Sequence, residues 1–202
     1  MPTTVDALTS LGLGLGLAAA CGFRVFVPLL VLSVGAHAGY VPLADGWQWM
    51  GSAPAMIAFA CATVFEVLGY CIPWVDHLLD LVATPAAVAA GMVTSASVLA
   101  DLPPLVRWTA VIIGGGGLAA IVQGATASAR VGSTAATGGL ANPAVATAEL
   151  AGSSTASAVA VLFPLFALAG VVLAVALAAL AIRRFGARRR QAVSPPACGS
   201  SS

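Results

Sequence analysis

Two charged side chains lie inside apolar segments, where they could bind a solute or exchange a proton. Arg24 interrupts the apolar run of residues 8–34, and Glu66 falls late in the run of residues 54–72. A charge within membrane hydrocarbon costs at least about 3 kcal/mol, so it is normally paired or faces water. Arg24 could capture an anion or a lipid phosphate, or form a charge pair that moves during transport. A static pair with Glu66 or Glu149 that fixes helix packing explains it equally. A lone carboxylate such as Glu66 can exchange a proton as its surroundings change.

Asp76 and Asp80 form a second candidate group, because residues four apart share one face of a helix. His77 lies beside them in the sequence. These side chains could gather a cation, but no second histidine is near, and an amphipathic helix at a membrane surface carries the same pattern. We therefore expect no bound metal and no cofactor.

The segment TGGLANP at residues 137–143 joins two glycines to a helix start. Asn142 is a typical helix cap, and Pro143 is a typical first helical residue. Such a segment can present backbone amides to an anion, and Arg130 could add a positive charge there. Ordinary turn chemistry selects the same residues. We expect a short helix after the turn, carrying Glu149.

Sequence motifs of catalysis are missing. The chain has no Gly-x-Ser-x-Gly elbow, no His-Glu-x-x-His zinc helix and no phosphate-binding Gly-x-x-x-x-Gly-Lys loop. Only His37 and His77 could act as histidine bases. We therefore expect a protein that is not an enzyme.

The elements that carry these residues belong to a chain that is more apolar than a water-soluble protein. Hydrophobic residues make up 60% of the sequence and charged residues 7%, and the mean hydropathy is +1.02. A soluble protein has roughly 25% charged residues. Three runs are long enough to cross a membrane, residues 8–34, 108–129 and 151–182, and residues 54–72 are a fourth candidate. We expect an all-α fold, a polytopic integral membrane helical bundle with four to five spanning helices.

Broken or re-entrant segments are expected in the first half of the chain. As one helix, residues 8–34 would be about 40 Å long, which exceeds the roughly 30 Å of a hydrocarbon core. Gly22 and Pro28 supply the means to break this run. Farther on, residues 74–82 indicate a short amphipathic helix, and residues 85–99 indicate a new helix with proline at its first position.

The second half is expected to contain a glycine-rich span, a polar connection and a last span. The run of residues 107–129 includes four consecutive glycines, which permit close contact between helices and could also support oligomers. The chain then becomes polar and small over residues 128–139, before the short helix that carries Glu149. The final span, residues 151–182, contains Pro164.

Arginines indicate the orientation and the end of the membrane domain. Five of the eight arginines lie within residues 183–190, directly after the last apolar run. Because such a basic stop is usually cytoplasmic, we expect one transmembrane domain over residues 1–184 and a basic, then disordered, cytoplasmic tail over residues 185–202. Counting spans back from the tail puts Arg107 on the cytoplasmic side and Arg130 on the far side. A stop-transfer flank also explains these arginines without nucleic-acid binding.

Three segments resemble a bacterial membrane family, domain-of-unknown-function family 4126. They are GFRVFVP at residues 22–28, EVLGYCIPWVDHLLDLVATP at residues 66–85 and TGGLANP at residues 137–143. The resemblance covers about residues 11–184. Its middle segment is the most specific and follows the family pattern at Glu66, Pro73, Asp76, Asp80, Thr84 and Pro85. Ala83 stands where relatives tend to carry histidine, which weakens a metal site further. The resemblance implies a membrane protein but no activity, substrate or cofactor.

We expect the polar residues of this membrane protein to meet at one site, formed by Arg24, Glu66, Asp76, Asp80, Arg130, Asn142 and Glu149. The absence of lysine beside abundant alanine, glycine and arginine suggests a GC-rich bacterial genome, and hence a bacterial inner membrane. Broken helices around intramembrane charges are typical of small transporters. The first hypothesis is therefore a transporter or permease-like protein, with a small solute, an ion or an anionic lipid as ligand. The second is a non-transporting scaffold or lipid-binding protein with static charge pairs. Membrane lipids surround the chain in both.

Overall fold

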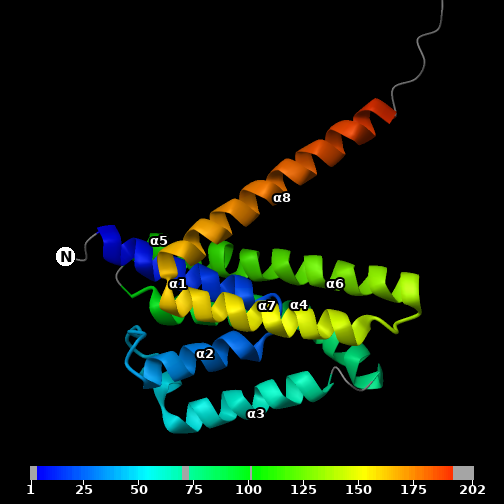
Figure 1. Cartoon of the computed structure of the whole chain (residues 1–202). Helices are drawn as coiled ribbons and strands as arrows, with labels where there is room; N and C mark the ends of the chain where they lie inside the picture. The colour runs from blue at the N-terminus through cyan, green and yellow to red at the C-terminus, as the bar shows by residue number, and fades with distance from the viewer. Residues whose placement is uncertain (1–3, 70–72, 101, 193–202) are drawn as a thin grey trace, which may run out of the picture.

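The computed structural model consists of helices and their connections throughout the part that it describes (Figure 1). It describes the backbone of residues 4–69, 73–100 and 102–192, and the side chains of these residues except 73–81, 181–182 and 184–192. In chain order the elements are α1 (Thr4–Cys21), α2 (Phe26–His37), η1 (Gln48–Gly51), α3 (Ala53–Gly69), α4 (Pro73–Val98), α5 (Pro104–Thr109), η2 (Ala110–Gly116), α6 (Gly117–Thr137), α7 (Asn142–Leu162) and α8 (Pro164–Ala192). The expected all-α fold is confirmed.

The first apolar run folds back on itself as a helical hairpin. Helix α1 ends at Cys21 and α2 begins at Phe26, so the chain breaks at Gly22, as the length of the run predicted. A side chain at Gly22 would place its Cβ 2.5 Å from the Cβ of Val122, so only glycine fits at this contact. Arg24 is therefore carried by the tip of a hairpin and not by the middle of a straight helix.

Helix α1 lies at the centre of the bundle, in contact with α4, α6, α7 and α8. Its glycine face packs inside the chain. A Cβ at Gly14 would lie 3.1 Å from Cγ2 of Val98, and one at Gly16 would lie 2.9 Å from the Cβ of Ala160. The core around α1 includes Leu13, Leu17, Leu32, Met50 and Leu99. Association of two chains through glycine faces stays a prediction.

Helix α4 continues through its proline, so the expected start of a new helix at residue 85 is wrong. Pro85 lacks the N–H that would bond to the preceding turn. The helix continues because the same face stays in the core on both sides of the proline. Ala83, Ala87 and Ala90 are all buried, at a spacing that places them on one side of a helix. Packing of this face outweighs the lost hydrogen bond.

A single helical column of 34 residues, Pro104–Thr137, contains α5, η2 and α6. The polar stretch that begins at residue 128 stays helical up to Thr137, and Gly138 then ends the helix with a φ of +63°. In η2 the backbone forms a wider π-helical turn. There Gly115 lies so close to α4 that a Cβ would sit 2.7 Å from the carbonyl oxygen of Gly91. The glycine run therefore permits the close helix contact that the sequence predicted.

The last apolar run is divided between two helices, which corrects the expectation of one span over residues 151–182. Helix α7 starts at the predicted asparagine–proline pair, but it is 21 residues long and not short. Helix α8 begins at Pro164 and diverges from the other helices (Figure 1). Between them, Phe163 has φ −138° and ψ 66°. The proline ring disfavours a helical conformation for the residue before it, so the chain turns here.

The outer surface of the bundle suits lipid. Three of the described helices are long and apolar enough to cross a membrane: Thr4–Cys21, Pro104–Thr137 and Asn142–Leu162. Shorter apolar helices complete the bundle: Phe26–His37, Ala53–Gly69, Val82–Val98 and Pro164–Leu180. Large apolar side chains point outward, and Phe65 and Phe166 are 75% and 74% exposed. An integral membrane helical bundle is confirmed, while the number of spans, four to five, stays a prediction.

We predict that Gly91→Ala lowers the free energy of unfolding by roughly 1–3 kcal/mol, because its Cβ would lie 2.7 Å from the Ala119 Cβ and the Gly115 carbonyl oxygen. Gly124→Ala is the matched control. It also lies in a helix, but nothing lies within 4 Å of its Cβ position, so we expect no loss of stability. Unfolding of the purified protein in detergent measures both. Equal stability of the two variants would contradict the close approach of α4 and η2.

Candidate functional site

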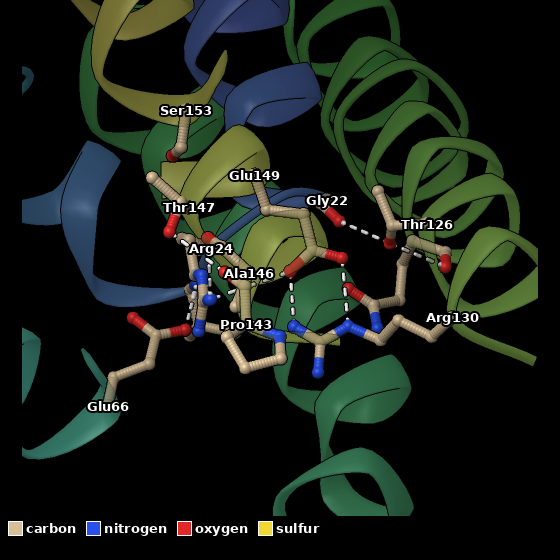
Figure 2. A network of polar contacts seen from close by, with 12 residues as sticks. Gly22, Arg24, Glu66, Thr126, Arg130, Pro143, Ala146, Thr147, Glu149 and Ser153 are labelled. Atoms are coloured by element: carbon tan, nitrogen blue, oxygen red, sulfur yellow. Dashed lines mark hydrogen bonds and ion pairs between the residues drawn. The ribbon is translucent and has the colours of Figure 1, made fainter. Parts of the chain in front are cut away.

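The tip of the α1–α2 hairpin brings Arg24 to a polar centre near α3, α6 and α7 (Figure 2). The backbone N–H groups of Gly22 and Phe23 donate to the carbonyl oxygens of Ala19 and Ala20, at 3.1 Å each, so the chain leaves α1 through a tight turn. Arg24 follows, with only 3% of its surface exposed. The turn thus directs an arginine into the bundle.

Arg24 joins the hairpin tip to α7. Its Nη2 donates a hydrogen bond to the carbonyl oxygen of Ala146 at 3.0 Å and lies 3.5 Å from Oε2 of Glu149. A guanidinium holds its donors in a fixed plane, so one arginine can engage a backbone carbonyl and a carboxylate on the same helix. Arg24 therefore fixes the level at which the tip meets α7.

Glu149 on α7 is held by two arginines from different elements. Nε of Arg130, on α6, donates to Oε1 of Glu149 at 2.8 Å, and Nη2 of Arg130 donates to Oε2. This is the two-pronged geometry of a strong arginine–carboxylate pair. The Arg130 and Glu149 side chains are 9% and 5% exposed. Because Arg24 reaches the same Oε2, Glu149 links the hairpin tip, α6 and α7 (Figure 2).

Glu66 on α3 occupies the N-terminal end of α2. Its Oε1 accepts a hydrogen bond from the N–H of Val25 at 2.8 Å, and its Oε2 accepts one from the N–H of Phe26 at 3.1 Å. Free N–H groups and the helix dipole favour a negative charge at such a position. Glu66 is itself buried. It therefore fastens α3 to the hairpin tip.

Two hydroxyl groups that sequence analysis missed also hold the tip. Ser153 on α7 donates to a carbonyl oxygen in the last turn of α1 at 3.1 Å, and Thr126 on α6 donates to the Gly22 carbonyl oxygen at 3.5 Å. Helical spacing could have found both. Thr126 lies four residues before Arg130, and Ser153 lies four residues after Glu149, so each shares a helix face with a buried charge.

The structure brings together some of the residues that the sequence singled out: Arg24, Glu66, Arg130 and Glu149. Asn142 is not among them. It lies at the α6–α7 turn, where its Nδ2 donates to Oγ1 of Thr134 at 3.1 Å. Asp76 and Asp80 belong to α4, and their side chains lie outside the described residues.

The segment of residues 137–143 forms the turn between α6 and α7. The N–H of Ala141 donates to Oγ1 of Thr137 at 3.1 Å, so this amide is used within the turn. Gly138 and Gly139 have φ values of +63° and +91°, which glycine adopts without strain. Ordinary turn chemistry accounts for this motif.

Opposite charges balance in the described part of the cluster, where two arginines face two glutamates. Each carboxylate oxygen of Glu66 and Glu149 accepts at least one hydrogen bond. Across the side chains that the structure describes, no three histidine, cysteine, aspartate or glutamate residues form a group that could hold a metal ion.

The apolar helices and the buried charges define an integral membrane protein with a polar centre. The chain belongs to the family described as Domain of unknown function (DUF4126), whose model matches residues 11–184. This match confirms the resemblance that its motifs showed. No curated protein and no solved structure matches the chain.

We predict strong energetic coupling between Arg130 and Glu149. Arg130→Gln and Glu149→Gln should each lower the free energy of unfolding by roughly 3 kcal/mol, since each removes the partner of a buried charge. The double variant should lose about 1–3 kcal/mol less than the sum. Denaturant unfolding in detergent measures this cycle.

The control cycle combines Thr134→Ala with Asn142→Ala, which removes an exposed hydrogen bond. Its coupling should stay below about 1 kcal/mol. Additive losses for Arg130 and Glu149 would show that their contact contributes no more than this surface pair.

Proposed function

We propose that this protein is a small transporter or permease-like protein of the bacterial inner membrane, and not an enzyme. Its solute or ion would be handled at the cluster of Arg24, Glu66, Arg130 and Glu149. One observation carries the proposal: buried charges of both signs meet at a helix break inside an apolar bundle. Charges are costly in such surroundings, and broken helices are where small transporters place solute-binding groups.

The tip of the α1–α2 hairpin is the segment that would respond to a solute in a transport cycle. Arg24 reaches Glu149 at 3.5 Å, whereas Arg130 holds the same carboxylate with two hydrogen bonds. The link from the tip to Glu149 is therefore the weaker of the two. A solute that engaged Arg24 would loosen the tip while α6 and α7 stayed joined.

A second candidate function is a non-transporting scaffold or lipid-binding protein. It is favoured by the hydrogen bonds within the chain that each carboxylate oxygen of Glu66 and Glu149 accepts. Buried ion pairs of this kind can serve to fix how helices pack. In that case, neutralising substitutions would change stability alone.

The charge cluster is proposed to lie toward the cytoplasm, with the C-terminus on the same side. The sequence indicated one crossing between Arg130 and the C-terminal arginines. Because α7 and α8 are separate helices, we propose two crossings. Helix α8 starts in the direction of α1, since Pro164 lies near Gly12 and Ala167 near Gly16. Arg130 and the C-terminal arginines then share one side, opposite Arg107. Basic residues concentrate on the cytoplasmic side.

Thiol labelling tests this orientation in a background with the four native cysteines replaced by alanine. Leu140→Cys lies in the α6–α7 turn and Tyr40→Cys in the connection after α2, at positions that are 88% and 75% exposed. We expect a membrane-impermeant maleimide to label Leu140→Cys in inverted inner-membrane vesicles alone. Tyr40→Cys should be labelled only in right-side-out vesicles. The reverse pattern would overturn the orientation.

Flux into proteoliposomes tests transport. We predict that the wild-type protein raises the flux of at least one of protons, potassium ions and inorganic phosphate. Arg24→Ala and Glu66→Gln should each abolish this flux, because they remove the charges that join the tip to α7 and α3. Far-ultraviolet circular dichroism and melting temperature verify that each variant is folded.

Arg107→Gln is the matched control for these variants. Arg107 lies at the other end of the bundle, where its Nη2 donates to the carbonyl oxygen of Ala96 at 3.1 Å. The Arg107→Gln variant should show the same flux as the wild type. Flux that survives in folded Arg24→Ala and Glu66→Gln would contradict the proposed site, and no flux in the wild type would favour the scaffold.

A further inference from the structure

Helix α8 leaves the bundle before it reaches its basic end (Figure 1). Its first turns pack on α1, where Pro164 lies near Gly12 and Ala167 near Gly16. Farther along the helix, residues 172–177 are all exposed. Six consecutive residues cover more than one full turn, so no side of this part is covered by the chain that the structure describes. In a membrane protein, lipid is the neighbour of such a surface.

The length of α8 places its arginines at the level of the lipid headgroups. Residues 164–182 contain no charged residue, and at 1.5 Å per residue they extend about 28 Å, close to the roughly 30 Å of a hydrocarbon core. Arginines then follow before the helix ends at Ala192, at positions 183, 184, 188, 189 and 190. They occupy about 10 Å of helix, similar to a headgroup layer of about 5–8 Å that a tilted helix crosses.

This part of the sequence contains no negative side chain that could balance its positive charge. The last acidic residue is Glu149, which is buried and accepts hydrogen bonds from Arg130. Residues 150–202 contain five arginines and no aspartate or glutamate. Arg183, the first of these arginines, is exposed. Such a concentration of positive charge at the end of a spanning helix attracts anionic lipid.

The spacing of the arginines favours lipid over a protein as the partner. At about 100° per residue, the five positions are spread around the whole helix axis, and no gap between neighbouring positions exceeds about 100°. A groove on a partner protein would contact one side of the helix, whereas lipid headgroups surround it. A guanidinium group also matches a phosphate group, because it can donate two parallel hydrogen bonds.

We infer that the basic end of α8, residues 183–190, is a binding site for the headgroups of anionic phospholipids. The phosphate groups balance the arginine charges and hold the end of a helix that the bundle contacts only through its first turns. A zwitterionic headgroup binds more weakly, because its own positive charge repels the arginines. This inference goes beyond the proposed transport and does not depend on it.

Spin-labelled lipids test the site on the purified full chain in phosphatidylcholine vesicles at about 0.1 M salt. Electron spin resonance measures how strongly each labelled lipid associates with the protein. Spin-labelled phosphatidylglycerol should associate at least about threefold more strongly than spin-labelled phosphatidylcholine. Replacing the five arginines of residues 183–190 by glutamine should abolish this preference. Replacing the same five by lysine keeps the charge and should keep the preference.

Two further measurements separate lipid binding from an effect on insertion, since arginines after a span also guide insertion. A variant with Arg188→Gln, Arg189→Gln and Arg190→Gln keeps the first two arginines and should lose part of the preference. Salt at about 1 M should lower the preference of the unaltered protein, because it screens charges beyond about 3 Å. Arg107→Gln, at the other end of the bundle, should change nothing.

Three results would overturn the site. They are equal association of the two lipids with the wild type, the same preference in the wild type and a folded five-glutamine variant, and a preference that salt leaves unchanged. A single-stranded RNA oligonucleotide serves as the competing polyanion. If it binds the wild-type protein and anionic vesicles do not displace it, the partner is a nucleic acid and the lipid site is rejected.

Discussion

A charge buried among apolar helices must be matched by an opposite charge or by hydrogen bonds, and this requirement determines how the helices of this bundle are aligned. Apolar surfaces can slide past one another at little cost. The carboxylate of Glu149 allows no such sliding, because Arg24 must reach it from the hairpin tip and Arg130 from α6. Glu66 then sets α3 against the start of α2. Two carboxylates thereby align most of the helices that surround the tip.

Small residues make this arrangement possible, since lipid provides no hydrophobic force that would drive one apolar helix against another. Association then depends on close packing and on polar contacts. The contact of Gly16 with Ala160 brings α1 close to α7, and this closeness lets Ser153 bond to a carbonyl oxygen of α1. The contact of Gly91 with Gly115 likewise brings α4 close to η2. The glycine, alanine and serine of this sequence therefore act together in packing.

Features that depend on local chemistry could be predicted from the sequence. The helix break at Gly22 follows from the length of the run, and the charged cluster follows from the cost of burying Arg24. Two prolines show where such prediction ends. Pro85 stays inside a helix whose buried face continues past it, whereas Pro164 follows a residue outside the helical region and begins a new helix. Only tertiary packing separates them. The sequence also places Asn142 with the charges, because a capping asparagine followed by proline occurs both in ordinary turns and in anion-binding sites.

The relation between α1 and α6 explains why Glu149 has unequal partners. The continuous column of η2 and α6 runs parallel to α1, since Leu15 faces Gly114 of η2 and Gly22 faces Val122 of α6. The segment Gly-Leu-Ala-Ala occurs in both, at residues 16–19 and 117–120, and an arginine follows each. Helix α6 continues beyond the level where α1 ends, so it presents its arginine from a rigid helix, whereas α1 presents its arginine from a turn. Glu149 therefore joins a turn of the chain to a long helix, and α3 is attached to the same turn through Glu66.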